Sequence, residues 1–252
     1  ENVLLFGDAS YDYKYRSSVN TNLVPVFESP VSLHDVNSHS SDDYIAFLDD
    51  GLGDWPYTLE GQRSHKLSIG VGRFPVKNLE EAAIMVDKVI FYENKVDLFG
   101  DWLNRLSFVA DDDDGNLHMS DAEVVANRAQ LSNPSMDIQK IYVDAYPEIS
   151  SPSGALSVEG KNALDRAIQD GTLILNYSGH GGEVGWTEEQ ILRLDQIAQW
   201  NNYEKLTFFF TATCEFGRYD DPDVVAGGEL VLLERSGGAV GIMTTTRPVY
   251  SS

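Results

Sequence analysis

Short apolar runs that suit β-strands alternate along the chain with segments of helical periodicity. In the helical segments apolar residues recur three and four positions apart, as over residues 79–94, where acidic residues also occupy the first turn. Strands separated by helices are joined by right-handed crossovers into a mainly parallel sheet with helices on both faces. The sequence therefore predicts an α/β fold. Strands are predicted in "NVLLFGD", "KLSIGVGRFPV", "RLSFVA", "IQKIYVDAY", "TLILNYSG", "KLTFFFTATC" and "AVGIMTTT". Further helices are predicted in "SDAEVVANRAQL", "VEGKNALDRAIQDG", "EEQILRLDQIAQW" and "VVAGGELVLLERSGG".

The length of 252 residues suits one large domain or two small ones. We predict two subdomains, residues 1–98 and residues 99–252. The chain begins on a strand-like run without a methionine and stops soon after another apolar run. We therefore expect the first subdomain to be incomplete at its N-terminus and the second at its C-terminus.

The charge and the cysteine content exclude several classes of partner and site. The chain carries 18 basic and 40 acidic residues, a net charge of −22, which repels a phosphate backbone and argues against nucleic acid as a partner. A single cysteine excludes an internal disulfide and a cysteine-rich zinc site. No apolar run approaches the roughly twenty residues that a membrane-spanning helix needs.

Three loops follow predicted strands and are the candidate places for a functional site. In parallel sheets ligands bind at the carboxyl ends of the strands, where loops vary on a rigid support. This rule selects the loops "ADDDDG", "SGHGGEVGW" and "TATCEFG".

The last two of these loops contain the residues of a thiol nucleophile and its base. Cys214 ends one strand and His180 ends the preceding one, and neighbouring parallel strands lie about 5 Å apart. A cysteine reacts as thiolate, so it needs a base within reach, and His180 fits this role. Glycines on both sides of His180 let a substrate backbone approach closely. The backbone N–H groups of Gly181 and Cys214 would stabilise the oxyanion of a tetrahedral intermediate.

These motifs resemble the gingipain-type cysteine peptidases, family C25 of the caspase-like clan. The resemblance rests on "NYSGHGG" followed by "TATCEFGRYDDP", and it extends to "SDDYIAFLDD", "SIGVGRFPVKNLEEA" and "GGAVGIMTTTRPVYSS". It implies a caspase/gingipain-like fold of two subdomains. Within the family, "TATCEFGRYDDP" and "TTTRPVYSS" are most similar to the C-terminal signal peptidase, or sortase, of the type IX secretion system.

The resemblance also implies roles for individual residues. Cys214 would attack the scissile carbonyl, and His180 would act as base and then protonate the leaving amine. In gingipains an acidic side chain orients the histidine, and the alignment suggests Asp112, with Asp111 as the competitor. For Asp113 and Asp114 we expect a solvated acidic loop or a cation site.

Substrate contacts are expected from His118, Trp186 and Thr246. His118 aligns with the acidic residue that arginine-specific gingipains carry in the primary pocket, although it could equally be an exposed loop residue. A neutral imidazole cannot replace a carboxylate as the partner of a guanidinium, so we do not expect a preference for arginine.

No cofactor is expected for the chemistry and no metal in the catalytic site. The run at residues 111–114 does not fit an EF-hand, because its first template position, 110, is alanine and its twelfth is an aspartate. Structural calcium is expected elsewhere, since the resemblance implies it and acidic residues cluster at Asp42, Asp43, Asp49, Asp50 and Asp54.

Two functional hypotheses remain open. The resemblance implies a cysteine endopeptidase or sortase that removes C-terminal sorting domains of exported proteins through a thioester and passes the acyl group to water or an amine. Its partners would be those protein substrates and other type IX secretion components, at the outer membrane or cell surface of a bacterium. The alternative is a non-catalytic docking module of an export assembly.

Overall fold

The central sheet forms from the strand-like runs of the C-terminal part of the chain. A computed structural model describes residues 1–29, 38–50, 66–94, 99–152 and 154–250. Its main sheet has five strands in the order β14-β13-β9-β5-β6, and all neighbours are parallel. The strands are β5 (Arg105–Ala110), β6 (Asp137–Tyr142), β9 (Ile174–Ser178), β13 (Thr207–Ala212) and β14 (Ala239–Met243).

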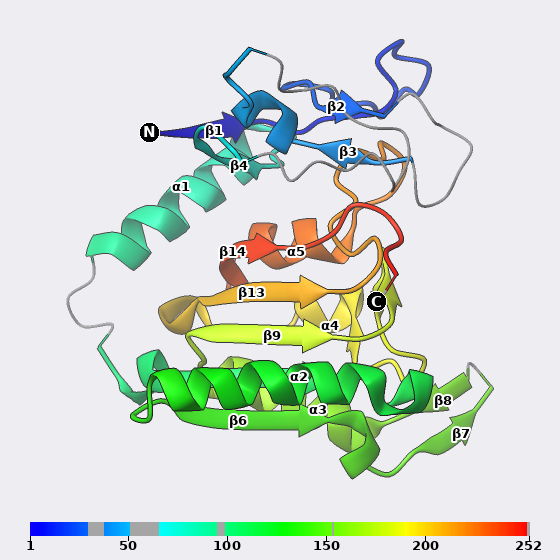
Figure 1. Ribbon diagram of the computed structural model, residues 1–252. Coiled ribbons are helices and arrows are strands. Elements are labelled where there is room, and N and C mark those ends of the chain that lie inside the picture. Colours follow the sequence, from blue (N-terminus) through cyan, green and yellow to red (C-terminus); the bar gives the residue numbers. More distant parts are fainter. Residues whose placement is uncertain (30–37, 51–65, 95–98, 153, 251–252) are drawn as a thin grey trace.

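Helices cover both faces of this sheet, as predicted (Figure 1). Helix α2 (Asp113–Ser132) lies on the near face in Figure 1, and α3 (Val158–Asp170) lies on the far face. The side chain of Ser157 caps α3 by accepting from the N–H of Gly160, and Gly171, with φ of 91°, ends the helix. The helix predicted over residues 158–171 ends at this glycine.

The N-terminal part adds a smaller parallel pair, β1 (Asn2–Phe6) and β4 (Gly70–Phe74), followed by α1 (Leu79–Asn94). Helix α1 has the predicted bounds and lies against α5 (Gly227–Leu233) and β14. Val76 and Met85 belong to the same buried apolar cluster as Val109 and Phe209 of the main sheet. The core is therefore continuous across residue 98, and the division into two subdomains stays a prediction.

The remaining elements are short. Among them, three small strands form an antiparallel sheet directly after His180. They are β10 (Gly181–Gly182), β11 (Gly185–Trp186) and β12 (Leu192–Arg193). The other short strands are β2 (Phe27–Glu28), β3 (Ser40–Ser41), β7 (Ile149–Ser151) and β8 (Gly154–Leu156). The short helices are α4 (Leu194–Ile197) and the 3₁₀ turns Asp43–Ala46, Asp101–Asn104, Val143–Ala145 and Tyr203–Lys205.

The helix predicted over residues 188–200 is mostly wrong. Only α4 is helical there, because residues 192–193 pair with β11 in the antiparallel sheet. Thr187 and Gln190 have positive φ values of 59° and 56°, which a helix cannot contain. Cross-strand pairing therefore outweighs the local helical pattern.

The order of the strands places a site at one end of the main sheet. The chain forms β5, then β6 on one side of it, and then β9, β13 and β14 successively on the other side. The strand order therefore reverses between β5 and β9, and ligands of such sheets bind at the carboxyl ends of the strands that flank this reversal. Among the described residues, no helix combines the length and apolar content that a membrane span requires.

Lys88 is an unusual core residue, because its side chain on α1 is fully buried. Its ammonium group donates to the carbonyl of Leu232 at 2.6 Å. Burial lowers the pKa of Lys88 to about 7, although the charge of Glu234 acts in the opposite direction. The folded protein thus binds this proton less tightly than the unfolded chain. Lys88 therefore lowers the free energy of unfolding most strongly below pH 7. This destabilisation decreases as the pH rises from 7 towards 10.5, the ordinary pKa of a lysine.

We therefore expect Lys88→Met to raise the free energy of unfolding more at pH 7 than at pH 9, by about 2 kcal/mol. The methionine keeps the apolar packing and removes the buried titrating group. Urea denaturation at the two pH values measures the difference. Lys66→Met, at an exposed lysine, is the matched control and should change little at either pH. Equal effects of Lys88→Met at both pH values would contradict the prediction.

Candidate active site

The loops after β5, β9 and β13 meet at the reversal of strand order. The last residues of the three strands, Ala110, Ser178 and Ala212, are aligned with one another in the ladders. The ladders continue by one residue, since Asp111 N–H donates to Ser178 O at 3.1 Å and Gly179 N–H donates to Ala212 O at 3.2 Å. The acidic run, His180 and Cys214 therefore leave the sheet side by side, as the strand-end rule predicts.

The backbone of His180 is held from two sides. Its N–H donates to Oδ2 of the fully buried Asp111 at 2.8 Å, and its carbonyl accepts from the hydroxyl of Tyr177. Burial raises the pKa of Tyr177 well above its ordinary value, so this hydroxyl remains a donor. A side chain at Gly179 would lie 2.4 Å from Cβ of Asp111 and 2.5 Å from the Tyr177 oxygen, so only glycine permits this approach.

The imidazole of His180 contacts Asp114. Its Nε2 lies 3.1 Å from Oδ2 of Asp114, and a carboxylate acceptor requires the proton on Nε2. The lone pair is then on Nδ1, which becomes the atom that can accept a proton from a thiol. The contact depends on an unusual start of α2, where Asp114, Gly115 and Asn116 have φ values of 55°, 63° and 70°. This left-handed stretch turns Asp114 towards the histidine.

The sequence suggests Asp112, or Asp111 as its competitor, as the partner of the His180 imidazole. Within the described part of the chain, neither carboxylate forms a hydrogen bond with that ring. Asp111 contacts the backbone of His180 instead, and its other oxygen accepts from the N–H of Asp112 at 3.0 Å. Burial is the main cause of a raised pKa of Asp112, and the charge of Asp111 adds to it. The carboxylate at the ring belongs to Asp114, for which the sequence predicts a solvated acidic loop or a cation site.

Cys214 is half-buried at the start of the loop after β13. Its Sγ accepts from the N–H of Val249 at 3.4 Å and lies 3.6 Å from the carbonyl of the same residue. The next residue, Glu215, has φ of 53°, a conformation rare outside glycine that marks a sharp turn at the thiol.

An arginine joins the histidine loop to the cysteine loop. Arg218 Nη1 donates to Oε1 of Glu183 at 2.5 Å, and the same nitrogen lies 3.5 Å from Oε1 of Glu215. Its other terminal nitrogen lies 3.2 Å from Oδ2 of Asp221. This cluster fixes the positions of the two loops relative to each other.

Gly181 and the predicted substrate residues lie in different surroundings. A side chain at Gly181 would lie 2.5 Å from Oγ1 of Thr213, so its backbone approaches the residue before Cys214, and the oxyanion role stays a prediction. Trp186 is only 1% exposed and stacks on Tyr177 at 4.1 Å. It also lines the pocket beside His180, and its role in substrate binding stays a prediction. Thr246 donates to the carbonyl of Ser40 and links the C-terminal segment to β3.

His118 lies beside His180 and is not an exposed loop residue. It belongs to α2, is 7% exposed, and its ring packs edge-on against that of His180 with centroids 5.1 Å apart. Its role in substrate binding stays a prediction.

Among the described residues, three groups of side chains near this site could hold a metal ion. In the described part, Asp111, Asp112 and Glu189 bring carboxylate oxygens within 4.8 Å of one another, a donor set that suits calcium. Asp114, His118 and His180 form the second group, and Asp111, Asp113 and His180 form the third. Of the aspartates for which we expected calcium, Asp42 is instead paired with Arg73 through two contacts of 2.8 Å, and Asp54 lies outside the described residues. Structural calcium therefore stays a prediction.

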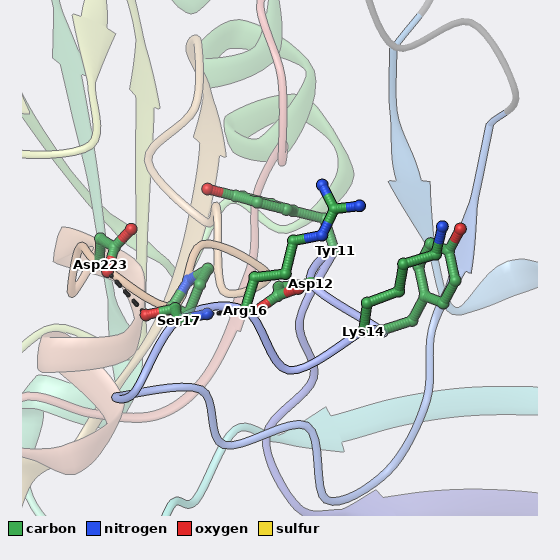
Figure 2. Close-up of a pocket in the computed structure, with 8 residues that line it drawn as sticks. Tyr11, Asp12, Lys14, Arg16, Ser17 and Asp223 are labelled. Atoms are coloured by element: carbon green, nitrogen blue, oxygen red, sulfur yellow. Dashed lines mark hydrogen bonds between the residues drawn. The ribbon is translucent and has the colours of Figure 1, made fainter.

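A separate pocket lies where the N-terminal loop meets the loop after Cys214. Figure 2 shows that Tyr11, Lys14 and Arg16 line it and that Ser17 contacts Asp223. The Ser17 hydroxyl lies 3.1 Å from Oδ1 of Asp223. None of the candidate catalytic residues lines this pocket, so it is not part of the site.

The fold and site define an α/β protein that presents a histidine and a cysteine at the carboxyl ends of neighbouring parallel strands. Residues 1–252 match the sequence profile of peptidase family C25, and the chain belongs to this family. Gingipain R2 and gingipain R1 of Porphyromonas gingivalis are each 25% identical over 155 residues, which cover 62% of this chain but 20% and 15% of theirs. The chain thus spans a fifth or less of the length of the relatives it matches.

Solved structures confirm the predicted fold. A crystal structure of the Arg-specific cysteine proteinase gingipain R superposes with a TM-score of 0.71 at 20% identity, covering 99% of this chain and 49% of that one. The complex of the pro- and mature domains of RgpB from P. gingivalis superposes with a TM-score of 0.68 at 19% identity, covering 98% and 50%. The predicted gingipain-like family and fold are therefore confirmed.

Asp114→Asn should lower kcat by about 10- to 100-fold, whereas Asp112→Asn should leave it within about threefold. The first change weakens the contact that holds the proton on Nε2 of His180, and the second removes a charge that does not touch the ring. Steady-state kinetics of the two isosteric variants measure the contrast. A larger loss for Asp112→Asn would restore that residue as the partner of the imidazole.

Proposed function

We propose that the protein is a cysteine endopeptidase in which Cys214 is the nucleophile and His180 the base. One observation carries the proposal: His180 is fixed by Asp111, Tyr177 and Asp114 so that its Nδ1 lone pair is available at the strand end next to that of Cys214. The thiol proton would pass to this nitrogen while sulfur adds to the scissile carbonyl. Collapse of the tetrahedral intermediate breaks the C–N bond, and the same proton goes to the leaving amine.

A pocket beside the histidine supports binding of an extended peptide. It is lined by His180, Gly181 and Gly182 and continues along β11 and β12. The glycines leave backbone groups accessible to a substrate main chain, which suits recognition of a peptide through hydrogen bonds. The chemistry and the adjacent pocket therefore favour a protein substrate.

We further propose that the substrates are proteins exported by type IX secretion and that cleavage removes their C-terminal sorting domains at the outer membrane or cell surface. The motifs "TATCEFGRYDDP" and "TTTRPVYSS" support this branch of the family, with other secretion components as partners. The thioester would transfer its acyl group to water or to an amine acceptor. The resemblance aligns His118 with the acid that it implies for the arginine pocket of gingipains, which supports a preference other than arginine.

The experiment compares an arginyl reporter peptide with an intact protein that ends in a sorting domain. Purified protein should cut the intact protein and cut the reporter poorly, because binding energy far from the scissile bond positions the carbonyl for attack. A primary amine added to the reaction should appear in the product if the acyl group is transferred. Efficient cleavage of the reporter would contradict the sorting-domain proposal and favour an arginine-specific peptidase.

A further inference from the structure

Three potential metal ligands meet at the proposed catalytic histidine. Asp114, His118 and His180 each bring one ligand atom within 4.8 Å of the others. Oδ2 of Asp114 lies 3.1 Å from Nε2 of His180 and 3.5 Å from Nε2 of His118. The two imidazoles therefore direct the same kind of nitrogen towards one carboxylate.

The ring of His118 gives an independent reason to expect a ligand. Its Nε2 is buried and has no hydrogen-bond partner, and the residue is only 7% exposed. A buried nitrogen without a partner is unfavourable, because it has lost its bonds to water without replacing them. Asp114 and His180 do not lack a partner in this way, because their side chains form a hydrogen bond with each other. An ion bound to all three would complete the coordination of His118.

The arrangement of the three ligands leaves one side open. Asp114 and His118 come from the first turns of α2, and His180 comes from the loop after β9. The side chains of Asp114 and His180 are 52% and 48% exposed, so solvent reaches these two ligands although His118 is buried. Three protein ligands with an open fourth position are typical of accessible zinc sites.

The donor set selects the class of ion. Imidazole nitrogens suit zinc and other late transition metals, whereas calcium and magnesium take oxygen ligands. The group therefore differs in chemistry from the neighbouring all-carboxylate group of Asp111, Asp112 and Glu189.

We propose that Asp114, His118 and His180 bind a zinc ion reversibly and that the bound ion switches off the peptidase. Zinc on Nε2 of His180 moves the remaining ring proton to Nδ1, so the ring has no lone pair left to accept the proton of Cys214. Zinc also takes Asp114 away from its contact with the imidazole. Binding of the ion needs no catalytic activity, and only the inhibition rests on the proposed function.

Titration calorimetry with zinc tests the site in the Cys214→Ala background, which removes the thiol as a competing ligand. One ion per chain is expected, and His118→Gln and Asp114→Asn should each weaken binding by about tenfold or more. His39→Gln is the control for a histidine outside the proposed site, and Glu189→Gln is the control for the neighbouring all-carboxylate group. Both variants should leave the zinc affinity unchanged. Absence of binding, or binding unchanged by both His118→Gln and Asp114→Asn, would overturn the proposal.

Zinc inhibition of the protein with Cys214 intact tests the switch. Activity, normalised for each variant, should fall over the same zinc concentrations at which binding occurs, and His118→Gln should shift this curve by the factor found in calorimetry. Inhibition that is insensitive to His118→Gln would assign the effect to the thiol and overturn the switch. Absence of cleavage before any zinc is added would instead contradict the proposed function and leave the calorimetric result on the site untouched.

Discussion

Cys214→Ala should abolish cleavage, with a loss in rate of about 10⁴-fold or more, while the protein remains folded. The covalent route requires the sulfur, because Cys214 is the single cysteine of the chain. The fold should tolerate the change, since the half-buried thiol makes only weak contacts with the backbone of Val249. The free energy of unfolding should change by less than about 1 kcal/mol.

The measurement combines cleavage of the intact substrate with urea denaturation of the same preparation. Ser236→Ala, which removes one heavy atom at an exposed position, is the control for an alanine change without effect. His180→Ala should cause a similar loss of cleavage, because the two residues act as a unit and their effects do not add. Full cleavage by Cys214→Ala would overturn the peptidase proposal and support the alternative of a non-catalytic docking module.

The sequence predicts best those elements that have local signals at both ends. Helix α1 has the predicted bounds, and α3 begins at its serine cap and ends at its glycine, because these signals act through neighbours in the chain. The strand-end rule then brings the histidine and cysteine loops together without knowledge of the strand order, since adjacent parallel strands share one edge. The fold class and the two central residues therefore follow from local patterns.

The sequence does not reveal surroundings that depend on contacts between distant segments. Trp186 becomes a core residue because β10 and β11 fold back over Tyr177, an arrangement that no local pattern reveals. Asp114 reaches His180 only through the left-handed stretch at the start of α2. One signal was present, since "DGN" contains the residue types that adopt this conformation most readily, and it could have drawn attention to Asp114.

The sequence also does not reveal which charged side chains form buried ion pairs. Arg247 and Asp220 each lie in a string that carries the family resemblance, "TTTRPVYSS" and "TATCEFGRYDDP", but neither string reveals that the two side chains form a buried ion pair. Arg247 Nη1 donates to Oδ1 of Asp220 at 2.8 Å and to the carbonyl of Thr246 at 2.7 Å, and a second nitrogen bonds to the other carboxylate oxygen. The pair fixes the C-terminal segment that reaches Cys214 through Val249.

Arg247→Ala should lower the free energy of unfolding by about 3 to 5 kcal/mol, because it leaves the fully buried carboxylate of Asp220 without a cation. Urea denaturation measures the loss. Arg235→Ala is the matched control, since its pair with Glu80 is mostly exposed, and its removal should cost less than about 0.5 kcal/mol. A loss as small as that of the control would show that the buried pair does not stabilise the fold.

The loss caused by Arg247→Ala should also increase with pH, because Glu28 shares the same arginine. Burial, followed by the charge of Asp220, raises the pKa of Glu28 from 4.5 to about 8, while Arg247, 3.8 Å away, opposes the shift. The folded protein holds this proton more tightly than the unfolded chain, so stability falls as the pH rises from 4.5 through about 8. Without Arg247 the pKa of Glu28 in the folded protein rises further, so the decrease of stability with pH continues to higher pH. Denaturation at pH 6 and pH 9 should therefore give the larger loss at pH 9, and a loss independent of pH would place Glu28 outside the influence of Arg247.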